Sequence, residues 1–221
     1  MKMEYYRKGL PHFHPMGAIF AVTTQLIDAV PRALLTNLQY ESEQIISNIE
    51  VDGLPEKALR KRGVHRAYEM ALEKLLHQKH RQEHLLSNPA AAKLVADKIM
   101  EFDGQFYDCL AYAIMSNHIH LLLDFSIQLP IDYDGVSQIP GYVNLDTVMK
   151  RIKGGTAHPI NRLSGRKGGV WRHGYYNRYI RNQEHFLQAF RYILNNPVKA
   201  GLVECWKEHP FTYGKLTDIL V

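Results

Sequence analysis

Two histidines inside an apolar run constrain the fold of this chain more than any other feature. The stretch "NHIHLLLD", residues 117–124, follows "GQFYDCLAYAIM", residues 104–115, with only Ser116 between them. Apolar, aromatic and β-branched residues dominate both stretches, as in strands of a packed sheet. The pattern predicts two adjacent antiparallel strands that are joined by a tight turn at Ser116-Asn117.

The strand predicted at residues 118–124 has two different faces. Because successive side chains of a strand alternate, His118 and His120 share one face, while Ile119, Leu121 and Leu123 share the other. Two imidazoles in register suit two nitrogen ligands of one divalent cation. The alternative, a pair of half-buried histidines packed against helices, stays open from the sequence alone.

The remaining segments predict an alternation of strands and helices. "GAIFAVTTQL", residues 17–26, favours a first strand, and residues 31–102 are helical in character, with Asn88 as an N-cap before Pro89. A helix can begin at Asn144, a strand is expected over residues 170–180, and Asn182 caps a last helix that Pro197 stops. This order resembles βαββαβ and predicts an α+β fold, an antiparallel sheet with helices on one face.

Length and composition fit one domain. The 221 residues, 46% of them hydrophobic, suffice for a single domain over residues 1–221 with a helical insertion at about 33–105. The two cysteines, Cys109 and Cys205, make neither a disulfide framework nor a metal knuckle. No apolar stretch approaches the ~18 residues of a membrane span, and the N-terminus lacks a signal segment. We therefore expect a cytoplasmic protein without membrane contact.

The last predicted helix presents a tyrosine away from its apolar stripe. Phe186, Phe190 and Ile193 lie along that stripe, and Tyr192 lies on another side, with Asn196 four residues further on the same side. An amide oxygen could join two histidines as a ligand of a hard cation. A phenol beside a metal could attack a phosphate, so these residues form a coherent site for phosphodiester cleavage. An ordinary surface tyrosine remains the alternative.

Four stretches together resemble the REP-associated tyrosine transposases, within the HUH single-tyrosine transposase superfamily. They are "LPHFHPMGAIFAVTTQL", "YAIMSNHIHLLLD", "IKGGTAHPINRLSGRKGGVWRHGYYNRYIRNQEHF" and "FRYILNNPVKAGLV". The resemblance implies a ferredoxin-like domain whose central strand carries the motif His118-Ile119-His120. It also implies Tyr192 as nucleophile and Asn196 as the residue that completes the metal site.

The resemblance further implies a mechanism and a substrate. The Tyr192 oxygen would attack a phosphate of a single-stranded DNA hairpin, such as a repetitive extragenic palindrome, giving a 5′-phosphotyrosine link and a free 3′-hydroxyl. Mg²⁺ or Mn²⁺ would be held by His118, His120 and Asn196. Monomers and homodimers both fit the sequence. Many family members have Asp where this chain has Asn177, so we assign this position no metal role.

Basic and aromatic residues near the predicted site are candidates for DNA binding. The net charge of +5 permits a polyanionic partner. Cationic side chains could contact phosphates, and tyrosines could stack on unpaired bases. The candidates are Lys150, Lys153, Arg162, Arg166, Lys167, Arg172, Arg178, Arg181, Tyr175 and Tyr176. Taken singly, each could instead be a solvated charge or a packed ring.

Two other functions compete with strand transfer. A domesticated protein could bind DNA hairpins without cleaving them, and a metal-dependent phosphodiesterase could cleave with water instead of tyrosine. The presence of His118, His120, Tyr192 and Asn196 together argues against lost catalysis. The helical region 33–105 could clamp a DNA hairpin or only thicken the helical layer.

Overall fold

A computed structural model describes residues 14–51, 57–78 and 84–215. The strands are β1 (Ile19–Gln25), β2 (Asp108–Ile114), β3 (His118–Asp124), β4 (Tyr176–Tyr179) and β5 (Thr212–Gly214). The α-helices are α1 (Arg32–Val51), α2 (Lys57–Leu76), α3 (Pro89–Met100), α4 (Leu145–Leu163), α5 (Gln183–Leu194) and α6 (Asn196–Lys199). Single turns of 3-10 helix occur at Leu85–Ser87, Ser126–Gln128 and Trp206–Glu208.

All five strands form one antiparallel sheet in the order β4-β1-β3-β2-β5. The first four strands give the order of the ferredoxin-like βαββαβ fold, so the predicted α+β class is confirmed. β2 and β3 are the predicted hairpin around Ser116 and Asn117. The predicted strand at 170–180 forms a sheet strand only over Tyr176–Tyr179, and β5 was not predicted.

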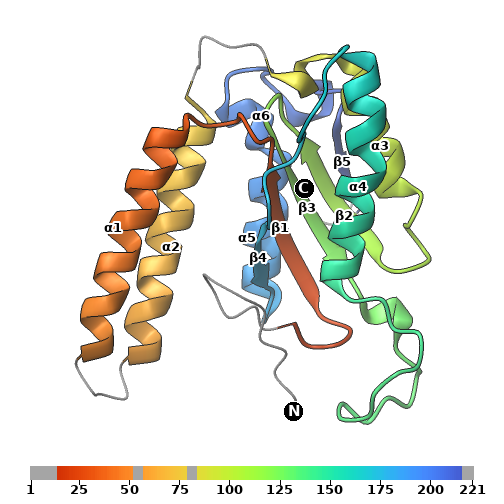
Figure 1. Cartoon of the computed structure of the whole chain (residues 1–221). Helices are drawn as coiled ribbons and strands as arrows, with labels where there is room; N and C mark the ends of the chain where they lie inside the picture. Colours follow the sequence, from red (N-terminus) through yellow and green to blue (C-terminus); the bar gives the residue numbers. More distant parts are fainter. Residues whose placement is uncertain (1–13, 52–56, 79–83, 216–221) are drawn as a thin grey trace.

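Helices cover both faces of the sheet, which corrects the expectation of helices on one face. Ile119, Leu121 and Leu123 of β3 belong to the core cluster that includes buried residues of α3 and α4. Leu122 points to the other face, where it packs in a cluster with Phe190 of α5. Figure 1 shows α4 and α5 on opposite sides of the sheet. Because β3 is buried at six of its seven residues, both of its faces need helical cover.

Helices α1 and α2 stand side by side next to the β4 edge of the sheet (Figure 1). We call residues 32–76 the α1–α2 hairpin; its connecting residues 52–56 lie outside the described ones. Buried Tyr68, Leu72 and Leu76 of α2 join the main core, whereas Tyr40 and Ile45 of α1 are exposed. Helix α2 therefore docks on the body along its C-terminal half, whereas α1 reaches the main core near its start, through Leu35. Helix α3 packs against α4 and β2 as a layer of the sheet domain.

Asparagine side chains begin three helices, as the sequence predicts. Asn88 accepts a hydrogen bond from Ala90 N, Asn144 from Thr147 N, and Asn182 from His185 N. The predicted end of the last helix is wrong, because α5 ends at Leu194 and Pro197 lies inside the short α6. Proline is tolerated there because the first turn of a helix does not use its N–H groups.

Within the described part of the chain, no helix has the length and apolar character that crossing a membrane requires.

Candidate metal centre

His118 and His120 face each other on the α5 side of β3. They are 1% and 2% exposed, and their Nε2 atoms lie 3.0 Å apart. Strand alternation puts both rings on one face, as predicted, and the register pairs His118 with Gln25 and His120 with Thr23 of β1. The centre of the sheet therefore presents two nitrogen donors at one point.

Hydrogen bonds fix the far side of each ring. The Nδ1 of His118 lies 2.6 Å from Asn117 Oδ1, and the Nδ1 of His120 lies 2.8 Å from Thr23 Oγ1. The Asn117 amide donates to Leu76 O at 2.9 Å, so its oxygen accepts from His118 and leaves that ring's Nε2 lone pair for a metal. Burial, and the neighbouring His120, lower the pKa of His118, which favours the neutral form that binds metals.

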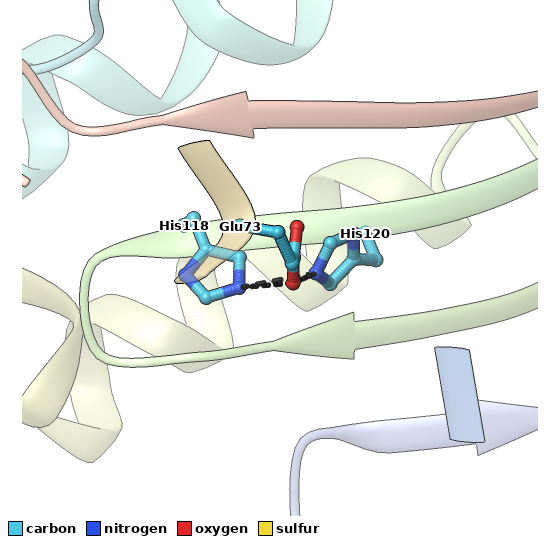
Figure 2. A group of neighbouring side chains, drawn as sticks. All are labelled: Glu73, His118 and His120. Carbon is cyan, nitrogen blue, oxygen red and sulfur yellow. Dashed lines mark hydrogen bonds and ion pairs between the residues drawn. The ribbon is translucent and has the colours of Figure 1, made fainter. Parts of the chain in front are cut away.

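Helix α2 brings a carboxylate, Glu73, to the two histidines (Figure 2). Its Oε1 lies 3.2 Å from His120 Nε2 and 4.0 Å from His118 Nε2, and 3.0 Å from the Nε2 of His77 one helical turn later. Burial alone would raise the pKa of Glu73, but the imidazoles of His120, His77 and His118 outweigh it and hold this pKa below its ordinary value. The carboxylate is therefore ionised at neutral pH.

Sequence reasoning missed Glu73. It precedes His118 by 45 residues and lies in a helix whose pattern indicates only a basic, solvated surface. The one available signal was its spacing, because Glu73 and His77 are four residues apart and share a helix face. Only the docking of α2 shows that this face meets the histidines.

Tyr192 and Asn196 complete the cluster from the C-terminal side. The Tyr192 ring stands edge-on to His120, with ring centroids 5.5 Å apart. Asn196 is fully buried at the start of α6, and its Nδ2 donates to Glu73 Oε1 at 3.4 Å. Burial raises the pKa of the Tyr192 hydroxyl, and the charge of Glu73 adds to the increase. The structure thus brings together the four residues predicted for the site.

The donor set fits a divalent cation. Two imidazole nitrogens and a carboxylate oxygen converge, and Asn196 Oδ1 is buried with no hydrogen-bond partner. Neighbouring ligands about 2.1 Å from an octahedral ion are themselves about 3.0 Å apart, which is the separation of the two Nε2 atoms. A buried oxygen without a partner is costly in a fold unless a ligand meets it.

The residues predicted to bind DNA lie on different sides of the sheet. Arg178 is exposed, and its register with Ala21 puts it on the histidine face; it also acts electrostatically on Tyr192. Asn177 pairs with Val22 and lies on the opposite face, away from the metal centre. Exposed Lys150 and Arg162 belong to α4, which covers that opposite face. Lys167 and Arg181 are exposed outside the named strands and helices.

Several of these residues have contacts within the fold. Lys153 Nζ donates to Arg172 O and Gly174 O, both at 2.6 Å, and Arg166 pairs with Asp28 at 3.4 Å. The Tyr175 hydroxyl donates to Asp146, and the Tyr176 hydroxyl donates to Tyr68 of α2. Roles of these residues in DNA binding stay predictions.

Comparisons with known proteins identify two curated relatives of this chain. No protein-family model matches the chain. A Haemophilus influenzae protein, whose name assigns it provisionally to the REP-associated tyrosine transposases, is 29% identical over 106 residues, 48% of this chain and 58% of that protein. An uncharacterized protein of the same organism is 29% identical over 96 residues, 39% of this chain and 52% of that protein. The chain thus spans little more than half the length of these curated relatives.

A solved structure has the same fold. It shows a REP-associated tyrosine transposase bound to a REP hairpin, and it matches with a TM-score of 0.50 at 16% identity. The match covers 95% of this chain and 82% of that chain. The α+β architecture with its five-stranded antiparallel sheet is therefore shared with that protein.

Proposed function

Since this chain belongs to the REP-associated tyrosine transposase family, we propose that it cleaves and rejoins single-stranded DNA at hairpins of the repetitive extragenic palindrome type. The observation that carries the proposal is the convergence of Tyr192 with His120, Glu73 and Asn196 around one buried point. A phenol, a pair of imidazoles and a carboxylate in one place are the groups that tyrosine-mediated phosphodiester cleavage needs.

Cleavage would exchange one phosphate ester for another. The Tyr192 oxygen forms a bond to phosphorus, and the bond between phosphorus and the 3′-oxygen breaks. The phenol proton is taken up by solvent, and the departing 3′-oxygen gains a proton, so that the products are a 5′-phosphotyrosine and a free 3′-hydroxyl. Because the new ester keeps the energy of the old one, a 3′-hydroxyl can reverse the reaction without ATP.

His118, His120 and Glu73 would hold a Mg²⁺ or Mn²⁺ ion, with Asn196 as a further oxygen donor. The bound cation would offset charge on the scissile phosphate and orient it. Asn117 and Thr23 keep the two rings in position through Nδ1. Burial of both histidines limits access of water to their Nε2 atoms.

The proposal is tested with DNA hairpins from the genome that encodes the chain, labelled at the 5′ or 3′ end and incubated with Mg²⁺ or Mn²⁺. A labelled band of protein size on a denaturing gel, absent with Tyr192→Phe, is the expected result. Tyr192→Phe should leave hairpin binding nearly unchanged, because only the hydroxyl is lost. His118→Ala should abolish metal-dependent cleavage.

Two other outcomes would contradict strand transfer. Free cleavage product without a covalent adduct would identify a hydrolytic phosphodiesterase. Hairpin binding without cleavage in either metal would identify a domesticated binding protein. An adduct that persists in Tyr192→Phe would move the nucleophile to another tyrosine, with Tyr175 and Tyr176 as the candidates.

A further inference from the structure

An open pocket of about 260 Å³ lies directly beside Tyr192. The end of α2 forms one wall and the segment from α5 to α6 forms the other. Its lining residues are Glu73, Lys74, His77, Gln78, Tyr192 and Lys199. Pockets that enclose drug-sized ligands measure about 300 to 1,000 Å³, so this space suits a phosphodiester group better than a whole nucleotide.

Two lysines give this pocket its cationic character. Lys199 Nζ lies 4.4 Å from the centroid of the Tyr192 ring, and both Lys199 and Lys74 are exposed, within reach of an incoming strand. Among the lining residues that the structure describes, Glu73 is the only carboxylate, and it already contacts His77 and His120. The positive charges of the two lysines therefore remain for an anionic ligand.

We propose that this pocket seats the scissile phosphate and that Lys199 is a catalytic residue, whose ammonium group pairs with a non-bridging oxygen while Tyr192 attacks. Lys74 supplies a second positive charge from the α1–α2 hairpin, so that this hairpin is part of the active site. The inference rests on the proposed strand transfer, with the same bonds formed and broken. Lys199 keeps its proton throughout.

The physical reason is the charge that develops on phosphorus oxygens during attack. A cation held beside the attacking oxygen is already in place when this charge develops, so it stabilises the charge without the reorganisation that water requires. The metal centre lies on one side of Tyr192, toward His120, and Lys199 lies over its ring. A phosphate in the pocket would therefore meet positive charge from two directions, with the phenol between them.

The first test compares the rate of adduct formation in single turnovers. Lys199→Gln should slow it about 100-fold, the scale seen when one transition-state donor is removed. Lys199→Arg should recover a large part of the rate, and Lys74→Gln should cause a smaller loss. Lys93→Gln is the matched control, because Lys93 is an exposed lysine of α3 paired with Asp97. It should react like the unmodified protein.

A second readout separates catalysis from a structural role. Sulfur replaces each non-bridging oxygen of the scissile phosphate in turn. In one of the two diastereomers, sulfur replaces the oxygen that pairs with Lys199, and the unmodified protein should form the adduct with this substrate more slowly. Lys199→Gln should not be slowed further by this diastereomer, but it should respond to the other diastereomer as the unmodified protein does. A variant that is merely less stable would respond to both sulfurs as the unmodified protein does.

Binding without metal gives a third readout. In EDTA, an oligonucleotide spanning the cleavage site should bind Lys199→Gln with a slope of log affinity against log salt reduced by about 1. A normal rate, sulfur response and salt slope in Lys199→Gln would overturn this inference and leave strand transfer standing. Absence of any adduct with the unmodified protein would overturn strand transfer itself and this inference with it.

Discussion

At the scale of single residues, Glu73 decides how the metal centre is completed. Glu73→Gln replaces an anionic ligand with a neutral amide, so the affinity for Mn²⁺ should fall at least about tenfold. The measurement is a titration followed by electron paramagnetic resonance of free Mn²⁺. Asn196→Ala, titrated in parallel, shows how much the amide oxygen adds.

Glu69 provides the control for this prediction. It lies one turn before Glu73 on α2, is also partly buried, and interacts with Arg178 and Arg66. Glu69→Gln should therefore bind Mn²⁺ like the unmodified protein. Equal affinities for Glu73→Gln and Glu69→Gln would exclude Glu73 as a ligand.

Lys153 makes stability depend on pH in a defined direction. Burial lowers the pKa of Lys153 from 10.5 to about 8. Between these values the unfolded chain binds more protons than the folded one, so the contribution of Lys153 to the free energy of unfolding rises with pH. Partial exposure screens this effect, and we expect about 1 kcal/mol between pH 7.5 and 9.5.

Urea unfolding of the unmodified protein and of Lys153→Met at both pH values checks the prediction. Most other titrating groups contribute equally to the free energy of unfolding of both proteins, so their contributions cancel in the difference between the two. It should shift in favour of the unmodified protein at pH 9.5. A constant difference, or a shift in the opposite direction, would contradict the assignment.

At the scale of elements, the N-cap of α5 supports the helix that carries Tyr192. Asn182 Oδ1 accepts a hydrogen bond from His185 N at 2.9 Å. Asn182→Ala should lower the free energy of unfolding by about 1 kcal/mol, whereas Asn182→Asp keeps an acceptor and adds a charge that favours a helix N-terminus. Chemical denaturation measures both. An alanine variant as stable as the aspartate variant would show that the cap contributes nothing.

The helices and strands also show which parts of the fold can be predicted from the local sequence. The three asparagine caps and the β2–β3 hairpin depend on a few neighbouring residues, and the sequence predicts all of them. Leu122 shows the limit of such reasoning. It shares the face of His118 and His120, which we assigned from the sequence only to the two histidines, yet it packs under α5. Whether helices cover both faces of the sheet depends on tertiary packing, and the alternation of side chains along one strand does not determine it.

For the candidate site too, local periodicity predicts which residues lie close together, but not which distant residue joins them. Strand alternation predicts that His118 and His120 lie close together, and helix periodicity predicts the same of Tyr192 and Asn196, although Asn196 begins α6 and not the last turn of α5. Their roles stay predictions. Glu73 was not predicted, since its position depends on α2 docking through Tyr68, Leu72 and Leu76. Nothing in the local pattern of α2 indicates which of its polar residues meets β3.

At the scale of the whole molecule, the positions of the basic residues predict which side binds DNA. Arg178 lies on the histidine face, whereas Lys150 lies on α4 across the sheet. If DNA follows the histidine face, Arg178→Gln reduces the slope of log affinity against log salt by about 1, and Lys150→Gln does not. Hairpin binding measured over a range of salt tests this. Equal reductions would show that DNA contacts both sides.

The position of Glu73 on the α1–α2 hairpin has a thermodynamic consequence. The same bound ion would join β3 to α2. Binding of the metal ion and docking of the α1–α2 hairpin are therefore linked, and each must strengthen the other by the same factor. At an ion concentration 100 times the dissociation constant, the docked arrangement gains about 2.7 kcal/mol. Hydrogen exchange of the α2 amides should therefore slow as Mn²⁺ is added, and Glu73→Gln should abolish that protection. Amide protection in α2 would then show whether His118 and His120 hold a metal ion, although these segments lie tens of residues apart in the sequence.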